Sequence, residues 1–351
     1  MTINKRIFGT TTSKETAYLF TLENELGMKA VVTNYGASLV SFIVPKKDGS
    51  VVDVVLGYDT LEEYENNSPF FGNVIGRNGN RIENGTFSID EIEYQLEKNE
   101  SGNSLHSCPN GYNTRVWKVE NPDEENNSIT FSLDSPHMDQ GFPGNFQISI
   151  TYTLLKDGAL ELHYTGKSDK KTVANLTNHS YFNLNGHDQG TILNHKLWLN
   201  AGNFTPVVDS KSIPTGVIES VKDTPMDFTT VKEIGKEIDA DYRQLQYTKG
   251  YDHNYVVDKV EEGLIKIAEV FNDDDSVKME VFSDLPGVQL YTGNLIGEKR
   301  GKNNAIYGNR SGLCLETQYF PNAVNEPSFL KPILDAGEVY DTKTIYKVRT
   351  E

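Results

Sequence analysis

The sequence predicts an all-β fold, a large antiparallel β-sandwich with few short helices. Three observations support this: segments of alternating apolar and polar residues recur along the chain, turn-forming tripeptides separate neighbouring segments, and helical periodicity is rare. Alternation with a period of two places successive side chains on opposite faces of a strand, so each segment offers one apolar face for packing. Many such strands, packed through their apolar faces, are typical of a sandwich.

The strands expected in the first half are rich in β-branched and aromatic residues. Turn tripeptides at 47–49, 89–91 and 156–158 each join two neighbouring runs, as antiparallel hairpins require. The expected strands are Ala17–Leu22, Lys29–Pro45, Val51–Gly57, Phe87–Leu96, Ser128–Leu133 and Phe146–Thr165.

The pattern continues in the second half, and helices are expected at only two places. Thr60 can cap a short helical turn at 60–64, and Thr229–Ile238 has room for about two turns. No repeat, low-complexity stretch or flexible linker interrupts the chain, so residues 1–351 are expected to form one domain. The remaining expected strands are Thr172–Leu176, Lys196–Leu199, Leu264–Phe271, Val277–Phe282, Val288–Tyr291, Leu313–Gln318 and Thr344–Val348.

Composition excludes several classes of partner and location. The 351 residues include 33 Lys and Arg against 50 Asp and Glu, a net charge of −17, which disfavours nucleic acids and anionic membranes as partners. The first ten residues are polar, and no apolar run reaches the roughly 18 residues of a membrane span. Cys108 and Cys314 are too few for a disulfide scaffold or a structural zinc site, so a cytoplasmic protein is expected.

Strand alternation removes one histidine from consideration and singles out one carboxylate. The apolar residues of Leu160–Tyr164 share one face, so His163 is expected to face water. In Leu313–Gln318, Glu316 shares a face with Cys314 and lies between apolar neighbours in what is expected to be a central strand. Burying a carboxylate there is costly unless it is paired, hydrogen-bonded or facing a wet cavity.

Common catalytic motifs are missing from the sequence. It has no phosphate-binding loop, dinucleotide-binding glycine motif, H-E-x-x-H zinc motif or G-x-S-x-G elbow, and no histidine lies at ligand spacing from another histidine or a cysteine. Four segments nevertheless concentrate polar and charged side chains. Each alone has a structural explanation, such as a hydrogen-bonded bulge, a surface ion pair or a turn cap. These segments are Gly76–Ile82, Thr177–Leu184, Gly250–Tyr255 and Cys314–Gln318.

Taken together and in this order, the segments resemble the aldose 1-epimerases, also called galactose mutarotases, over nearly the whole chain. The most specific strings are TNHSYFNL at 177–184, GYDHNYV at 250–256, LPGVQLYTG at 285–293, and LCLETQ at 313–318 followed by Pro321-Asn322-Ala323. The resemblance implies a β-supersandwich fold and interconversion of the α and β anomers of free sugars such as galactose and glucose. It implies no cofactor or metal. The expected binding partner is a sugar, and the protein is expected to be a monomer or a homodimer.

The resemblance also implies five site residues. Arg81 matches the sugar-binding arginine of the family's Asn-Arg-Ile motif, and His106 matches the histidine of its Leu-His-Gly-Gly motif. His179 matches the Asn-His-Ser histidine, Asp252 the Gly-Tyr-Asp-His aspartate and Glu316 the Leu-Glu-Thr-Gln glutamate. The expected catalytic residues are Glu316 and His179, and the expected substrate-binding residues are Arg81, His106 and Asp252.

The chain departs from the family pattern at two places. Ser107 and Cys108 stand where the family has two glycines, and His137 and Met138 stand where it has Asp-Gly. Both changes are expected to remodel the rim of the pocket and to allow reducing disaccharides as substrates. Cys108, beside His106, is expected to make activity sensitive to thiol reagents.

Sugar ring opening requires a base at the O1 hydroxyl and an acid at the ring oxygen O5. We assign Glu316, ionised, as the base and His179, protonated, as the acid, with the roles reversed on closure; His106 is a second candidate at O5. His187 and His195 fit structural roles better, and a role for His253 stays open. Two rival functions are a non-catalytic carbohydrate-binding protein on the same fold and an epimerase of phosphorylated hexoses, which would need more basic residues around the pocket.

Overall fold

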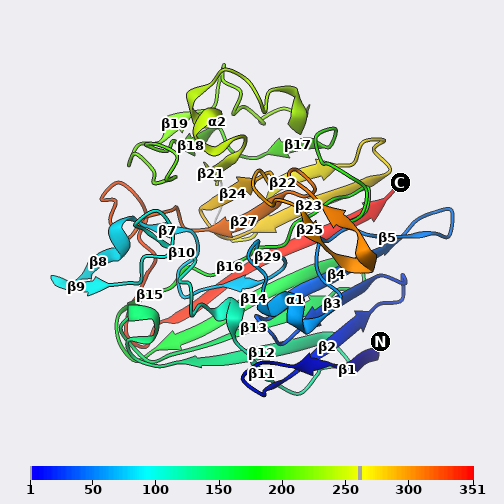
Figure 1. Cartoon of the computed structure of the whole chain (residues 1–351), viewed down its shortest axis with the longest axis horizontal. Coiled ribbons are helices and arrows are strands. Elements are labelled where there is room, and N and C mark those ends of the chain that lie inside the picture. Colours follow the sequence, from blue (N-terminus) through cyan, green and yellow to red (C-terminus); the bar gives the residue numbers. More distant parts are fainter. Residues whose placement is uncertain (1, 260–262) are drawn as a thin grey trace.

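A nine-stranded antiparallel sheet runs through the computed structural model, which describes residues 2–259 and 263–351 (Figure 1). The last strand of the chain lies in the middle of this sheet and joins its two halves. In spatial order the strands are β11 (Lys118–Val119), β12 (Ser128–Ser135), β13 (Phe146–Leu154), β14 (Ala159–Ser168), β29 (Val339–Thr350), β23 (Val277–Ser283), β22 (Ile265–Phe271), β17 (Lys196–Leu199) and β20 (Lys232–Glu233).

A five-stranded N-terminal sheet packs against one half of the large sheet. Phe20 and Phe131 from the two sheets contact each other with ring centroids 5.7 Å apart, and Tyr152 donates a hydrogen bond to the Ala37 carbonyl (2.7 Å). Both faces contribute to one buried apolar core, as their alternating sequences require. The strands are β1 (Thr2–Thr10), β2 (Thr16–Glu23), β3 (Lys29–Thr33), β4 (Ser38–Pro45) and β5 (Val51–Asp53).

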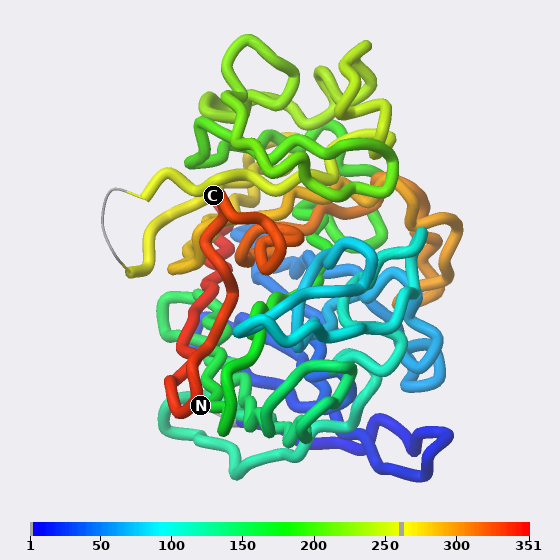
Figure 2. The backbone as a smooth tube through the Cα atoms, turned by 90° about the vertical axis from the view of Figure 1, so that its left-hand side faces the viewer, coloured from blue at the N-terminus to red at the C-terminus, as the bar shows by residue number. Residues whose placement is uncertain are grey.

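A second five-stranded sheet covers the other half, and it carries part of the site. Thr317 of this sheet and Thr344 of β29 are joined by a hydrogen bond of 2.5 Å, which fixes the distance between the two layers. Figure 2 shows the N-terminal segments (blue) and the segment around residues 200–250 (green) at opposite ends of the molecule. In order the strands are β19 (Glu219–Ser220), β18 (Asn203–Thr205), β21 (Asp252–Val256), β24 (Gly287–Tyr291) and β27 (Cys314–Gln318).

Short strand pairs, two short α-helices and five single 3-10 turns complete the described elements. The helix α1 (Leu61–Glu65) begins with a capping box between Thr60 and Glu63, as expected from Thr60. In the described residues no helix has the length and apolar character needed to cross a membrane. The other elements are α2 (Arg243–Thr248) and the pairs β6 (Val74–Ile75) with β16 (Thr177–Asn178), β7 (Arg81–Ile82) with β10 (Ser104–Leu105), β8 (Thr86–Ile89) with β9 (Ile92–Gln95), β15 (Thr172–Val173) with β28 (Ile333–Leu334), and β25 (Lys299–Arg300) with β26 (Ile306–Tyr307).

The all-β sandwich prediction is confirmed, but several local predictions are wrong. The expected strand Lys29–Pro45 is two strands, β3 and β4, which pair with each other. The expected helix at Thr229–Ile238 instead contains strand β20 and a single 3-10 turn, because Lys232 and Glu233 pair with β17. The strand with Glu316, expected to be central, is the last strand of its sheet. Leu313, just before β27, forms a bridge with Phe182, and β16 lies against β27; all five residues of β27 are buried.

Candidate active site

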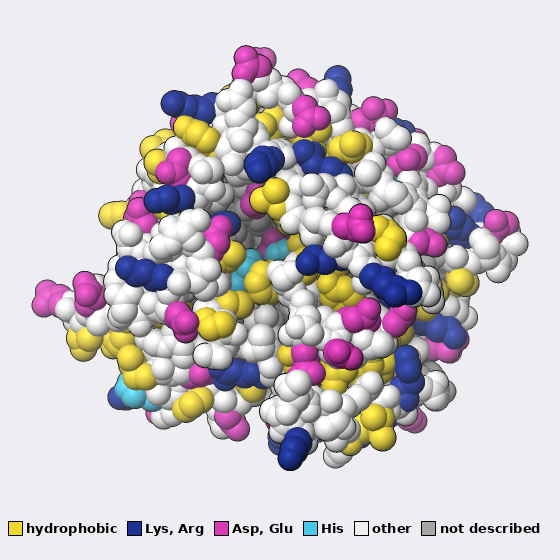
Figure 3. Space-filling model, in the orientation of Figure 1, with side chains coloured by type: hydrophobic (Ala, Val, Ile, Leu, Met, Phe, Trp, Pro, Cys, Tyr) yellow, Lys and Arg dark blue, Asp and Glu magenta, His cyan; other side chains and the backbone are white. Residues whose placement is uncertain are grey.

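One cavity is lined by all five site residues that the sequence predicts. Arg81, His106, His179, Asp252 and Glu316 line a space of about 180 Å³. In the space-filling view, histidine side chains show at the floor of a hollow near the centre of this face (Figure 3). The other lining residues are Ser68, Pro69, Phe70, Asn80, Leu105, Tyr181, Thr248, Tyr291, Leu295 and Ile296.

Glu316 reaches the cavity because of the alternation along β27. Leu315 belongs to the apolar core and Thr317 contacts β29, so both side chains face the large sheet, and Glu316 points to the opposite side. Glu316 is 2% exposed, and its Oε2 atom is buried without a hydrogen-bond partner among the described residues. A carboxylate oxygen in this position is available to a ligand hydroxyl.

His179 lies beside Glu316 in the wall of the cavity. It follows β16 directly, and its backbone is fixed by hydrogen bonds with Asn73 and Gly72 (2.9 and 3.0 Å). His179 Nε2 lies 3.6 Å from Glu316 Oε1, and Nδ1 lies 3.5 Å from Cys314 Sγ. The imidazole therefore presents Nε2 to the carboxylate while its other nitrogen contacts a buried thiol.

Arg81 begins β7, and His106 directly follows β10, the strand paired with β7. His106 Nδ1 accepts a hydrogen bond from the Asn80 backbone N–H (3.1 Å), so a neutral His106 carries its proton on Nε2 and acts as a donor. Arg81 is 9% exposed and forms two hydrogen bonds with Glu100, from Nε (3.2 Å) and Nη2 (3.0 Å). Arg81 thus forms an ion pair with Glu100, one of the structural explanations considered for the polar segments, and it also lines the cavity.

Asp252 completes the polar side of the cavity from the start of β21. Gln289 Nε2 donates a hydrogen bond of 2.6 Å to Asp252 Oδ1. Gln289 lies on β24 between the two carboxylates, directly opposite Glu316 in the strand register. No role for this glutamine was predicted from the sequence; its position two residues before Tyr291 on an alternating strand was the available signal.

Burial sets the protonation of the acid and the base in this sugar-free site. It raises the pKa of Glu316 well above the usual range, with the charge of Asp252 adding to the effect, and it lowers the pKa of His179 to about 4. Both shifts disfavour the charged forms, so burial favours a proton on Glu316 and a neutral His179. This differs from the expected ionised Glu316 and protonated His179, because that expectation took no account of the loss of solvation in a closed cavity.

The remaining cavity residues differ in charge. Burial lowers the pKa of His106, and the neighbouring His179 and Arg81 add to this, so His106 is neutral. Burial raises the pKa of Asp252, while Arg81 and the Gln289 hydrogen bond oppose that change. For Arg81 burial works against the charge, but the Glu100 hydrogen bond and nearby carboxylates outweigh it and raise the pKa.

The only three-residue donor group in the described residues is His106, His179 and Glu316, with ligand atoms within 4.8 Å of one another. A histidine that ligates a metal through one nitrogen normally donates the proton on its other nitrogen to an acceptor. Here Nδ1 of His106 already accepts the Asn80 N–H, so neither nitrogen suits a metal. The donor set does not fit a metal centre.

The other histidines considered from the sequence have structural partners. His253 Nε2 lies 3.2 Å from Gln244 Oε1 and does not line the cavity. His195 Nε2 accepts the Leu184 N–H (2.9 Å). His187 contacts the Tyr307 hydroxyl (2.9 Å), and His163 contacts Asp341 (2.7 Å) at the surface.

The departures expected to remodel the pocket rim do not reach it. Ser107, Cys108, His137 and Met138 are not among the residues that line the cavity. Ser107 keeps a left-handed backbone (φ 55°), and its hydroxyl accepts from Asn78 N (2.9 Å) and donates to Asn78 O (3.0 Å), which holds this conformation. Burial raises the pKa of Cys108 to about 11, which removes the basis for expecting a reactive thiol there.

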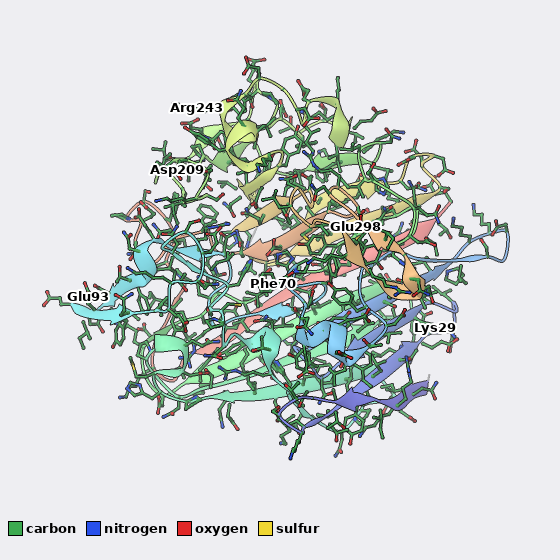
Figure 4. The ribbon with its side chains drawn as sticks, in the orientation of Figure 1. Lys29, Phe70, Glu93, Asp209, Arg243 and Glu298 are labelled. Carbon is green, nitrogen blue, oxygen red and sulfur yellow. The ribbon has the colours of Figure 1, made fainter. Side chains whose placement is uncertain are left out.

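Three aromatic residues that were not predicted as site residues from the sequence also line the cavity. Phe70 lies near the centre of the face in Figure 4 and contacts the rings of both His106 and His179 (centroids 5.0 and 5.7 Å). Tyr181 stacks on His179 at 5.1 Å, and Tyr291 lies on β24. Such rings suit the apolar face of a sugar. Tyr181 is two residues after His179, so alternation was a usable signal.

Comparisons with known proteins agree with this geometry. Residues 18–347 match the family of aldose 1-epimerases. Galactose mutarotase of Homo sapiens is 38% identical, covering 98% of each chain, and aldose 1-epimerase of Escherichia coli (strain K12) is 35% identical, covering 95% of each. The crystal structure of galactose 1-epimerase from Lactobacillus acidophilus superposes with a TM-score of 0.86 at 25% identity, covering 99% of each chain. The chain therefore belongs to the aldose 1-epimerase family of enzymes that epimerise carbohydrates.

Proposed function

We propose that this enzyme interconverts the α and β anomers of free aldohexoses, with galactose and glucose as substrates, through Glu316 and His179. The observation that carries the proposal is the 3.6 Å approach of His179 Nε2 to Glu316 Oε1 in a buried cavity with Arg81, His106 and Asp252 around it. A carboxyl and an imidazole that lie side by side at this separation can each form a hydrogen bond with one of the two oxygens on the same anomeric carbon. The relatives named galactose mutarotase favour galactose.

In the proposed reaction the pair exchanges protons with the sugar and gains none overall. Sugar hydroxyls that bind the Glu316 carboxylate replace its lost solvation and lower its pKa, so the proton of the pair moves to His179. Glu316 then takes the O1 proton while His179 protonates O5; the C1–O5 bond breaks and C1=O forms. The aldehyde turns about C1–C2 and recloses on its other face with the same two transfers reversed.

The cavity size favours a single sugar ring. About 180 Å³ is below the roughly 300–1,000 Å³ of pockets that enclose drug-sized ligands. A reducing disaccharide can react only if its second ring lies outside the cavity. Since the departures at Ser107 and His137 do not line the cavity, they give no support to a preference for disaccharides.

The function is tested by NMR exchange between anomers at equilibrium, with galactose, glucose, maltose and glucose 6-phosphate. We expect exchange far above the uncatalysed rate for galactose and glucose, and slower exchange for maltose. Exchange at background for both monosaccharides contradicts the proposal. Binding without exchange would instead identify a non-catalytic carbohydrate-binding protein.

A preference for phosphorylated hexoses is disfavoured by the charges of the cavity. Among the lining residues Arg81 is the sole Lys or Arg, and it is already paired with Glu100, while Asp252 and Glu316 are acidic. Binding of a phosphate group needs several unpaired, positively charged hydrogen-bond donors. Faster exchange with glucose 6-phosphate than with glucose would reverse this conclusion.

The protonation of Glu316 and His179 in the free enzyme predicts a bell-shaped pH dependence of kcat/KM. Below about pH 4, His179 is protonated as well as Glu316, so neither group of the pair can act as the base. Above the raised pKa of Glu316, the pair loses its only proton and the acid is lost. Activity is therefore expected to be flat between these two pKa values and to fall on both sides of that range.

The location of the proton is measurable directly. In the ¹⁵N spectrum of histidine-labelled enzyme without sugar at pH 7, we expect His179 to show the shifts of a neutral imidazole. The His179→Asn variant assigns the signal, since only that resonance disappears. Imidazolium shifts at pH 7 would contradict our distribution and restore the assignment expected from the sequence.

A further inference from the structure

A chain of buried amides connects the two sides of the cavity behind its wall. Asn80 Nδ2 donates to Gln318 Oε1 (3.5 Å), Gln318 Nε2 donates to Gln289 Oε1 (3.3 Å), and Gln289 Nε2 donates to Asp252 Oδ1 (2.6 Å). Gln318 is fully buried and does not line the cavity. The link joins residues that are 172 positions apart, from Asn80 beside Arg81 and His106 to Asp252 on β21.

The direction of donation is fixed at both ends of the chain. An ionised Asp252 can only accept, so Gln289 must turn its Nε2 toward it and its Oε1 toward Gln318. At the other end Asn80 Oδ1 accepts from the Arg81 backbone N–H (2.9 Å), so its Nδ2 must face Gln318. Gln318 therefore has a single orientation, which its further bond to Asn254 Oδ1 (3.1 Å) also requires.

We propose that Gln318 is a positioning residue that orders Asp252 and Asn80 for sugar binding through this one-way amide chain. The inference rests on the proposed function, because it assigns Asp252 to the sugar. The chain occupies Oδ1 of Asp252 and leaves Oδ2 for a sugar hydroxyl. At the other end of the chain, the backbone N–H of Asn80 donates to His106 Nδ1. The residue that Gln318 positions therefore also orients the His106 ring.

The chain also acts on the charge of Asp252. Donation from Gln289 stabilises the carboxylate against the burial that raises its pKa. If Gln318 is replaced by a residue that neither accepts from Asn80 nor donates to Gln289, the Gln289 amide that donates to Asp252 loses its fixed orientation. Asp252 then takes up a proton at higher pH, and a sugar that needs the ionised carboxylate binds more weakly as pH falls.

Two variants test the inference. Gln318→Met keeps the shape without hydrogen bonds, and Gln318→Glu places an oxygen where Nε2 donates to Gln289 and Asn254. For galactose we expect about a tenfold or larger rise in KM in both, with kcat changed less than about threefold. We also expect the acid-side midpoint of the KM profile to move to higher pH. The control Gln147→Glu makes the same change on the exposed face of β13.

A merely structural role gives a different result. Partial unfolding lowers the apparent kcat, but it leaves KM and its pH dependence unchanged, so Gln318→Met decides the question even if Gln318→Glu does not fold. Folded Gln318→Met with the KM and pH profile of the unmodified enzyme overturns the inference. An inactive unmodified enzyme instead overturns the proposed function, so the two failures are distinguishable.

Discussion

Glu316→Gln lowers kcat for galactose mutarotation by about 10²- to 10⁴-fold, which is the typical contribution of one positioned proton transfer. The amide keeps the size of the side chain and can still bind a hydroxyl, but it takes no proton from O1. The buried cavity offers no replacement from bulk water, because Glu316 is 2% exposed. KM is expected to change only a few-fold. NMR exchange between galactose anomers measures both constants.

The control for this variant is a second carboxylate outside the cavity. Glu161 lies on the solvent-facing side of β14 and pairs with Lys343, so Glu161→Gln is expected to keep the full rate. Glu316→Asp should recover part of the loss, since it restores the base one methylene short of its position. Near-full activity of Glu316→Gln would remove Glu316 from the mechanism.

His179→Asn is expected to produce a loss of similar size, about 10²- to 10⁴-fold in kcat. Asparagine can donate a hydrogen bond toward O5, but it cannot transfer a proton there. The substitution also removes the ring that Phe70 and Tyr181 contact, so a moderate rise in KM accompanies the loss. The matched control is His163→Asn on the surface of the large sheet.

The double variant distinguishes a coupled pair from two independent groups. If Glu316 and His179 act as one acid–base unit, losing either partner already removes the concerted transfer, and removing both adds little further loss. Independent groups would instead give the product of the two single losses. Full activity of His179→Asn would leave O5 to another donor, for which His106 Nε2 is the candidate.

Alternation and turn chemistry made the strands and hairpins predictable, because they are local properties. The turns at 47–49, 89–91 and 156–158 do join the antiparallel pairs β4–β5, β8–β9 and β13–β14. The strand β20 was not predictable in this way, since its two residues are held by pairing with β17 rather than by their own pattern. The same holds for β1, whose polar residues pair along the whole of β2.

The five site residues were found through motif resemblance, and the structure brings them to one cavity. What the sequence could not provide is the contacts among them. The bond from Gln289 to Asp252 depends on the register of β21 with β24, and the bond from Asn80 to Gln318 joins segments that meet only in the folded chain. The reversed protonation of the pair has the same origin, since it follows from burial rather than from residue type.

The central place of β29 in the large sheet has a consequence for synthesis. On the ribosome β29 emerges after every other strand described here, yet β14 and β23 meet only through it. Until it arrives, both strands present open edges to other nascent chains. The interval before β29 emerges is therefore the period of greatest aggregation risk, and factors that shield newly made chains would matter most then.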